Sequence, residues 1–455
     1  MLPSVDQSSA MLDGLIRDEE RKFVERAPRA ARYAARANSI MPGGVTSSWQ
    51  ISKPQPIWIE EGRGSRVWDV DGNEFIDYHG GYGAMLAGHA HPAVVSAVTE
   101  RVRRGTHFAQ PTPDAIVVVE QLIERYGMPM WRFGNSGTEA TMDAIHLMRA
   151  ITGRDLIIKF EGAYHGHHDA AMVSVWNEDG LGPQHRPMAV AAGAGIPQAM
   201  IDLTLVATFN DLALVETLFA EHPDEIAGII VEPILQNCGI LKPDDGFLGG
   251  LREIADRNDA LLTFDEVKTG LTVGRGGATK HYGVQPDIVC LAKALGGGLP
   301  ISAIGGTEEV MGAITDGTYD QVGTFNGNPL SMAATRAMLT EVMVPETYDH
   351  LDGLQTKMRS GAEEIISRHH LTAHVATAGA KGSVIYSSEP MKTYRDFLRI
   401  DERYAIAAWL YQFNRGVFLP PWAKGEQWLI SVQHSMDDID RYLETLDGFA
   451  DVITS

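Results

Sequence analysis

The sequence has few cysteines and no long apolar run. Among its 455 residues only Cys238 and Cys290 are cysteines, and both lie in or beside apolar segments. Two such cysteines do not supply a disulfide framework, so we expect a reducing, cytoplasmic setting. No 18 consecutive residues are apolar, which predicts no membrane span. The N-terminal segment lacks the apolar stretch of a signal peptide, so none is expected.

A surplus of positive charge is missing as well. The chain carries 38 Lys and Arg residues against 59 Asp and Glu residues, a net charge of −21, and it has no basic run. This balance predicts that neither nucleic acid nor an anionic membrane is a partner. Hydrophobic residues make up 44% of the chain and charged residues 21%, which is typical of a globular protein with one large and one smaller domain.

Seven short apolar segments alternate with helix-length segments between about residues 110 and 310. They read "WRFGNS", "DLIIKFEG", "LTLVATFN", "AGIIVEPI", "ALLTFDEV", "DIVCLAK" and "ISAIGG". Strands of four to six residues separated by helices favour a mainly parallel, doubly wound sheet covered on both faces. The fold class predicted for this large domain is therefore α/β.

The two ends of the chain have a different pattern. Residues 1 to about 40 show helical spacing of apolar residues, and residues 56–78 alternate around the turn "DVDGNE", as in a small antiparallel β unit. The C-terminal part is helical with short strands such as "GSVIYSS" and "EQWLISV". We predict that residues 1–75 and 331–455 form a smaller α+β domain, and residues 76–330 the large domain.

Three ionisable residues stand at the carboxyl ends of predicted strands: Glu232, Asp265 and Lys293. Ligands of open α/β sheets bind beyond these strand ends, so we expect the three side chains to converge on one crevice. Lys293 precedes a triple glycine in "LAKALGGGLP", where backbone or a ligand can approach closely. Lysines are seldom buried, but a partly desolvated one can act as an amine nucleophile and form a Schiff base.

Two further features suit pyridoxal 5'-phosphate. A carboxylate such as Asp265 can keep the pyridine nitrogen of this cofactor protonated, although a helix cap would also explain an acid there. Ser136, Gly137 and Thr138 begin a predicted helix in "GNSGTEATMDAIHLMRAITG". Their backbone N–H groups and hydroxyls make a ready anion site, and Ser136 can also form a capping box with Glu139.

The segment "FEGAYHGHHDA" adds Tyr164, whose ring could stack on a flat cofactor. Its histidines also suit a metal-dependent hydrolase, although no HExxH spacing is present and Lys293 would have no role. A non-catalytic binding protein would leave both Lys293 and Asp265 without a purpose. The ligands of the metal alternative would come from His165, His167, His168, Asp169, Asp265 and Glu266.

Several motifs together resemble those of the class III pyridoxal-phosphate aminotransferases, and among these the glutamate-1-semialdehyde 2,1-aminomutases. They are "NSGTEATMDAIHLMRAITGRDLIIKFEGAYHGHHD", "FDEVKTG", "PDIVCLAKALGGGLPISAIGG" and "GTFNGNPLSMAA", and the resemblance runs from about residue 38 onward. It implies the fold-type I architecture of pyridoxal-phosphate enzymes. It also implies that Lys293 holds the cofactor as a Schiff base and shuttles the proton, while Asp265 pairs with the pyridinium nitrogen.

The same resemblance assigns further roles. It implies that Val267 and Tyr164 pack against the two faces of the cofactor ring and that Glu232 and Asn210 lie near its 3-oxygen. Ser136, Gly137 and Thr138 would hold the phosphate. Thr324 would reach the phosphate of the neighbouring subunit, which implies a homodimer with active sites at the interface. Glu426 aligns with an active-site glutamate of the aminomutases.

One departure from the aminomutase pattern concerns the substrate. In "PGGVTSSWQ", Gln50 stands where those enzymes have an arginine that grips the substrate carboxylate. An amide cannot replace the two charge-assisted hydrogen bonds of a guanidinium. We therefore expect a transaminase that moves an amino group from a primary amine or an ω- or β-amino acid to an oxo-acid.

The alternative is an aminomutase in which another cation, such as Arg275 or Lys424, replaces the arginine. Neighbouring aromatic residues could line a more apolar substrate pocket or belong to the core. They are Trp49, Tyr82, Phe108 and Trp422.

Overall fold

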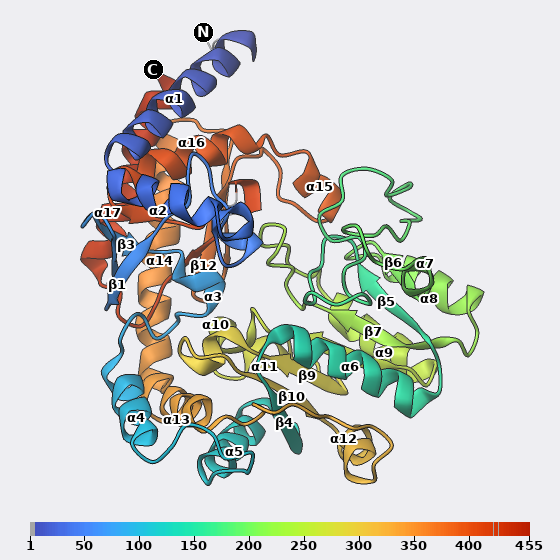
Figure 1. Ribbon diagram of the computed structural model, residues 1–455. Coiled ribbons are helices and arrows are strands. Elements are labelled where there is room, and N and C mark those ends of the chain that lie inside the picture. Colours follow the sequence, from blue (N-terminus) through green and yellow to red (C-terminus); the bar gives the residue numbers. More distant parts are fainter. Residues whose placement is uncertain (1–4, 422, 426) are drawn as a thin grey trace.

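The computed structural model describes residues 5–421, 423–425 and 427–455 (Figure 1). Glu426 and Trp422, both expected near the substrate, lie outside the described residues. No helix in the described ranges is long and apolar enough to cross a membrane.

A seven-stranded sheet forms the centre of the large domain, in the order β4-β10-β9-β8-β7-β5-β6. Strand β10 runs antiparallel to β4 and β9, and the remaining neighbours pair in parallel. Each strand coincides with one of the seven predicted segments to within one residue at its start, so the mainly parallel sheet is confirmed. The bounds are β4 Met130–Gly134, β5 Leu156–Phe160, β6 Thr204–Ala207, β7 Ile226–Val231, β8 Leu261–Asp265, β9 Ile288–Leu291 and β10 Ser302–Gly306.

Helices cover both faces of this sheet, because successive side chains of a strand point to opposite faces. On β7, Ile230 packs in the cluster of α6 (Gly137–Thr152), whereas Ile229 packs in the cluster of α8 (Leu212–Glu221) and α9 (Phe247–Arg257). The other helices of the large domain are α4 Pro92–Val102, α5 Asp114–Tyr126, α7 Gln198–Asp202, α10 Gly270–Val273, α11 Gly277–Tyr282, α12 Glu308–Thr315 and α13 Pro329–Ala337.

Both ends of the chain build the smaller domain, and the two termini lie at the same end of the molecule (Figure 1). Strand β13 (Val417–Phe418) pairs in parallel with β3 (Glu74–Asp77), which joins the C-terminal part to the antiparallel unit of β1 (Ile59–Arg63) and β2 (Arg66–Asp69). A second sheet has the order β11-β12-β14. The remaining bounds are β11 His374–Ala378, β12 Lys381–Ile385, β14 Trp428–Leu429, α1 Val5–Glu25, α2 Pro28–Asn38, α3 Gly80–Gly83, α14 Pro345–Arg368, α15 Tyr394–Leu398, α16 Glu402–Phe413 and α17 Met436–Thr454.

A smaller α+β domain from both chain ends is therefore confirmed. The boundaries at residues 75 and 330 stay a prediction, and β3 runs across the first of them.

Candidate active site

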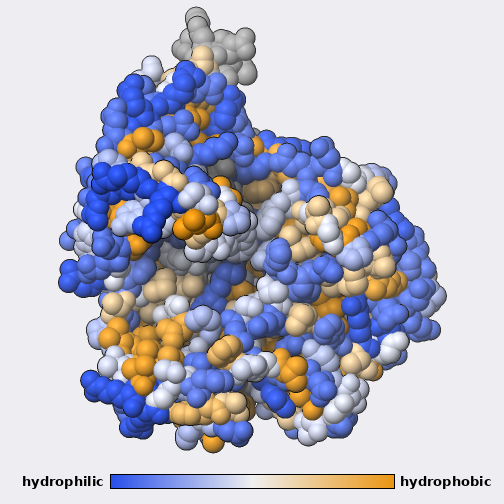
Figure 2. Space-filling view, viewed as in Figure 1, coloured by the Kyte–Doolittle hydropathy of each residue, from blue (hydrophilic) through white to orange (hydrophobic). Residues whose placement is uncertain are grey.

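A cleft of about 960 Å³, counted with its open mouth, lies at the carboxyl edge of the large sheet. Glu232 follows β7, Asp265 ends β8, and Lys293 comes two residues after β9; all three line the cleft. The predicted convergence is thus confirmed. Figure 2 shows the surface hollowed between the small domain above and the large domain below.

The backbone turns sharply at Lys293. Ala292 is extended, with φ −163°, and Lys293 itself has φ +48°, a conformation that non-glycine residues seldom adopt. Such strain is often found at functional sites. Burial lowers the pKa of Lys293, while Asp265 and Glu232 act in the opposite direction. A lowered pKa raises the fraction of neutral amine at pH 7, and the neutral amine is the nucleophile.

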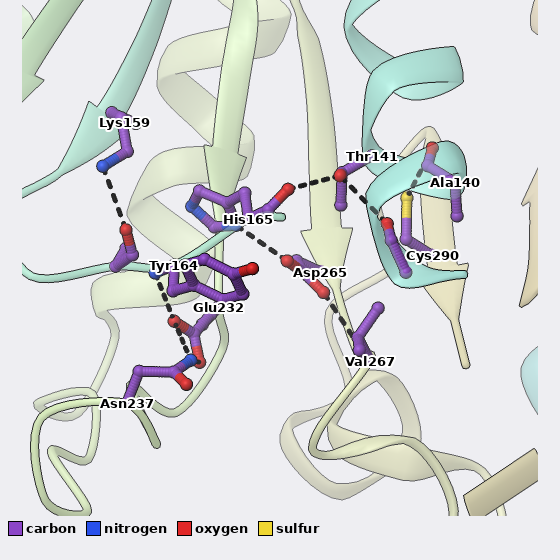
Figure 3. Close-up of polar contacts among 12 residues, drawn as sticks. Ala140, Thr141, Lys159, Tyr164, His165, Glu232, Asn237, Asp265, Val267 and Cys290 are labelled. Atoms are coloured by element: carbon purple, nitrogen blue, oxygen red, sulfur yellow. Dashed lines mark hydrogen bonds and ion pairs between the residues drawn. The ribbon is translucent and has the colours of Figure 1, made fainter. Parts of the chain in front are cut away.

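Asp265 is buried, and two hydrogen bonds fix its carboxylate (Figure 3). Its Oδ2 pairs with Nδ1 of His165 at 2.8 Å, and its Oδ1 accepts from the N–H of Val267 at 3.0 Å. His165 is buried too, and its Nε2 has no partner among the described residues. The sequence suggested His165 only as a metal ligand, and its role beside Asp265 was missed. The available signal was that both residues stand at carboxyl ends of strands of one sheet.

Glu266, the neighbour of Asp265, faces away from the cleft. Its buried carboxylate accepts hydrogen bonds from the N–H groups of Ala278 and Thr279 at 2.6 and 2.7 Å, and from the hydroxyls of Thr279 and Thr269 at 2.7 and 2.9 Å. It therefore caps α11, and burial raises the pKa of Glu266.

The ligands suggested for a metal hydrolase are not brought together. His168 contacts the hydroxyl of Thr141 at 3.3 Å, and His167 is exposed. In the part of the chain that the structure describes, no three His, Cys, Asp or Glu side chains form a group that could hold a metal ion.

The predicted anion site is the first turn of α6. Ser136 Oγ accepts from the N–H of Glu139 at 3.3 Å, and Glu139 Oε2 accepts from the N–H of Ser136 at 3.0 Å, so the capping box is confirmed. The N–H groups of Gly137 and Thr138 have no acceptor in the described chain, and both residues line the cleft. Unsatisfied N–H groups at the start of a long helix attract an anion.

Val267 and Tyr164 line the same cleft. A Cβ on Gly137 would lie 2.9 Å from Cγ1 of Val267, so only glycine allows this close approach. The Tyr164 ring stacks on Trp176 at 5.2 Å and tilts against Trp49 at 5.3 Å. Burial raises the pKa of Tyr164 to about 12, so its hydroxyl is neutral at pH 7. That the two side chains hold the cofactor ring stays a prediction.

Glu232 is held by neighbours rather than by a cation. It accepts hydrogen bonds from the Tyr164 N–H at 2.9 Å and the Asn237 amide at 3.0 Å (Figure 3). It also accepts from the Gln236 N–H at 3.2 Å. Asn210 does not line the cleft, because its amide donates to the carbonyls of Lys242 and Lys392, both at 3.2 Å. Asn237 takes the place beside Glu232 that Asn210 was expected to have.

The predicted substrate residues divide into two groups. Trp49 lines the cleft, and Tyr82 lies against Trp49 and donates from its hydroxyl to the Trp49 carbonyl. Gln50 is exposed and braces its own loop, since its Oε1 accepts from the N–H and hydroxyl of Thr46 at 3.1 and 2.7 Å. Phe108 is exposed and does not line the cleft of its own chain, so it belongs neither to the core nor to this part of the pocket.

Neither cation suggested as a replacement for the arginine reaches the cleft. Arg275 pairs with Glu124 at 2.8 Å on the surface of the large domain. Lys424 donates to the carbonyl of Leu398 at 3.3 Å and lies 3.9 Å from Glu178. Both suggestions are wrong.

Thr324 is exposed in a turn. The nearby Asn326 accepts from the amide of Asn135 at 3.0 Å, and Asn135 lines the cleft beside Ser136. The turn therefore lies at the anion end of the cleft of its own chain. The contact of Thr324 with a neighbouring subunit stays a prediction.

The donor set fits pyridoxal phosphate. It offers unsatisfied N–H groups for a phosphate, a slot beside Val267 for a ring, a buried carboxylate and a lysine amine, all in one cleft. These are the partners that the cofactor's phosphate, ring, pyridine nitrogen and aldehyde require.

The sequence of this chain matches a known protein family. The family described as "Aminotransferase class-III" matches residues 49–409. A curated relative, the glutamate-1-semialdehyde 2,1-aminomutase of Desulfitobacterium hafniense, is 37% identical over 421 residues, which cover 91% of this chain and 96% of the relative.

Solved structures are similar over nearly the whole chain. An ω-transaminase from Sphaerobacter thermophilus has a TM-score of 0.90 and 32% identity, covering 95% of this chain and all of that one. A glutamate-1-semialdehyde aminomutase from Pseudomonas aeruginosa in complex with PMP has a TM-score of 0.89 and 28% identity, with coverages of 98% and 99%. A β-phenylalanine aminotransferase from Variovorax paradoxus has a TM-score of 0.84 and 27% identity, with coverages of 96% and 97%.

Proposed function

This chain belongs to the class III aminotransferases, and from that premise we propose that it moves an amino group from a primary amine or an ω- or β-amino acid to an oxo-acid. The family resemblance read from the motifs is confirmed, and with it the fold-type I architecture, the enzyme class and pyridoxal phosphate as cofactor. The observation that carries the proposal is the meeting of Lys293, Asp265 and the open end of α6 in one cleft.

The cofactor, when bound, supplies an electron sink for the charge that develops on the substrate carbon. The Lys293 amine would hold the cofactor covalently between turnovers. During turnover its Nζ would carry a proton between the substrate carbon and the cofactor. Asp265, fixed by His165 and the Val267 N–H, holds a proton on the pyridine nitrogen. The N–H groups of Gly137 and Thr138 bind the phosphate.

The net reaction has two halves that use the same residues. In the first, a donor gives up its amino group and leaves as the corresponding oxo compound. In the second, an oxo-acid takes the amino group and leaves as an amino acid. Lys293 moves one proton in each half. No outside oxidant or reductant is consumed, because the oxidation of the donor amine to an oxo compound is matched by the reduction of the oxo-acid to an amino acid. The water taken up in the first half is released in the second.

A second candidate is an intramolecular amino transfer of the glutamate-1-semialdehyde 2,1-aminomutase type. The 37% identity with an aminomutase favours it, and Gln50 in place of the arginine opposes it. Product analysis separates the two, because a transaminase needs a second substrate whereas an aminomutase isomerises one alone.

We also propose a homodimer with active sites at the interface. Exposed apolar side chains come from α4, α5 and the loops around residues 108 and 324, and Figure 2 shows apolar surface at the lower left, where α4 lies. Such a surface suits a contact with a second copy. The residues are Val95, Val102, Phe108, Ile116, Val322 and Phe325. Sedimentation equilibrium tests this: a monomer at all concentrations contradicts it.

A cytoplasmic location remains part of the proposal. Its support is that Cys238 and Cys290 are both free and buried, as suits a reducing compartment.

The enzyme proposal is tested on purified protein supplied with pyridoxal phosphate. We expect an absorbing, yellow protein in which borohydride reduction attaches the cofactor to Lys293, as peptide mass spectrometry can show. A panel of amines and amino acids with pyruvate or 2-oxoglutarate then identifies the donor class. A colourless protein whose activity requires an added metal would contradict the proposal.

A further inference from the structure

A second cavity of about 550 Å³ adjoins the cleft, and Trp49, Asn237 and Lys268 line both. Its walls are aromatic where Tyr82 and Trp176 face it. Among the described residues, its charged side chains are Lys268 and Lys381. No part of the reaction described above uses Lys381.

Lys381 begins β12, the central strand of its sheet, and only 3% of the residue is exposed. Its backbone is held on both sides, by pairing with Ala378 and Leu429, and its carbonyl accepts from the amide of Gln355 at 3.2 Å. Its ammonium group, by contrast, makes no hydrogen bond or ion pair with any residue in the described ranges.

Lys159, the other buried lysine among the described residues, and the half-buried Lys268 do find partners. Lys159, on β5, donates to the carbonyls of Ala163 and Val173. Lys268 donates to the carbonyl of Gln236 at 2.8 Å. A buried ammonium group without such a partner is costly, so an anion beside Lys381 would stabilise its charged form.

Gly83 lies close to the side chains of both Lys381 and Lys293. A Cβ on Gly83 would lie 2.5 Å from Nζ of Lys381 and 3.9 Å from Cδ of Lys293. Both lysine side chains therefore come close to the same point. An anion bound by Lys381 would lie near the side chain of Lys293.

The charges around Lys381 also favour a bound anion. Burial, followed by the nearby Lys268 and Lys293, lowers the pKa of Lys381, and Glu232 opposes this shift. Glu232 does not neutralise the lysines by direct contact, because its oxygens bind Tyr164, Gln236 and Asn237. A carboxylate in the cavity would relieve the repulsion among the three lysines.

We propose that Lys381 binds the carboxylate of the amino donor, replacing the arginine that Gln50 has displaced. This inference rests on the proposed transaminase function and narrows it. The donor is then an amino acid whose carboxylate lies within a carbon or two of the amino-bearing carbon, rather than a simple amine. The aromatic wall of Trp49, Tyr82 and Trp176 accommodates an apolar side chain of that amino acid.

The experiment compares two donors of the same skeleton, 3-amino-3-phenylpropanoate and 1-phenylpropylamine, which differ by the carboxylate. We expect Lys381→Met to lower the ratio of kcat/KM for the acid over that for the amine by about 10- to 100-fold, the usual effect of one hydrogen bond to a charged group. Lys381→Arg, which keeps the charge, should retain a preference for the acid. The surface lysine variant Lys392→Met should leave the ratio at the wild-type value.

A binding measurement without turnover completes the test. Calorimetry on the cofactor-loaded enzyme should show that 3-phenylpropanoate binds the wild type more tightly than Lys381→Met by a similar factor. Equal losses with both donors would mean that Lys381 acts on Lys293 instead, and wild-type kcat/KM with both donors would mean that it binds no carboxylate. Both results overturn the inference and leave the transaminase intact. If neither donor reacts with the wild type, the proposed donor class fails, and the calorimetric comparison still decides the anion site.

Discussion

Replacing His165 by phenylalanine tests how Asp265 is positioned. The substitution keeps a flat ring in a buried place and removes one polar contact, the 2.8 Å bond from Nδ1 to Asp265. Nothing is lost at Nε2, which has no partner among the described residues. A hydrogen bond to a charged group is worth about 1.5–3 kcal/mol. We therefore expect kcat/KM to fall by about 10- to 150-fold.

The assay is transamination by the cofactor-loaded enzyme, together with the absorption spectrum of the bound cofactor. The spectrum should change, because a carboxylate held only by the Val267 N–H is less well placed against the ring nitrogen. His165→Asn should restore part of the activity, since an asparagine amide nitrogen occupies nearly the position of Nδ1. His146→Phe, on the exposed side of α6, serves as the matched control.

The reasoning is refuted if His165→Phe folds, binds the cofactor and keeps wild-type kcat/KM and spectrum. Asp265 would then be positioned well enough by the Val267 N–H alone. A loss of thermal stability without any spectral change would make His165 a packing residue rather than a positioning one.

Three more outcomes follow from the structure. Lys293→Ala should abolish turnover and remove the site of borohydride labelling, as peptide mass spectrometry can show. Gly137→Ala places a Cβ 2.9 Å from Val267 Cγ1, and overpacking of this kind costs about 1–3 kcal/mol, so equilibrium dialysis should show weaker cofactor binding. Burial lowers the pKa of Lys159 from 10.5 to about 7. Between pH 7 and 10.5 the unfolded chain therefore binds more protons than the folded one, so the free energy of unfolding rises with pH. Urea titrations at pH 7 and 9 should show that Lys159→Met loses this rise.

Each of these has a control in the chain. Lys280→Ala should keep both turnover and the label on Lys293. Gly193→Ala, where an added Cβ meets nothing within 4 Å, should leave cofactor affinity intact. Lys392→Met should keep the pH dependence of unfolding, and an equal difference between pH 7 and 9 in Lys159→Met and the wild type would contradict the assignment to Lys159.

The large sheet could be predicted because its signals are local. Each buried strand is a short apolar run bounded by helix-length segments, so the seven runs marked β4 to β10. The same pattern located Glu232, Asp265 and Lys293, since the carboxyl ends of parallel strands share one edge. The capping box of Ser136 and Glu139 was also local, as its two residues are three apart.

The direction in which a side chain points was harder to predict than the position of its residue in the fold. Asp265 and Glu266 are adjacent acids at one strand end, yet one lines the cleft and the other caps α11, because neighbouring side chains point to opposite sides. The partner of Glu266 lies 13 residues further on, in a helix that only the folded chain brings back.

The sequence pattern was sufficient to predict which residues lie at the catalytic edge of the sheet, because that edge depends on spacing along single strands. The surroundings of the substrate depend instead on how the small domain packs against the large one. Lys381 begins a strand of the small domain, more than 80 residues after Lys293, and both side chains come close to Gly83. The residues next to Lys381 in the sequence do not identify it as a binding residue. The burial that would make it one comes from segments that are distant in the sequence and pack around it in the folded chain.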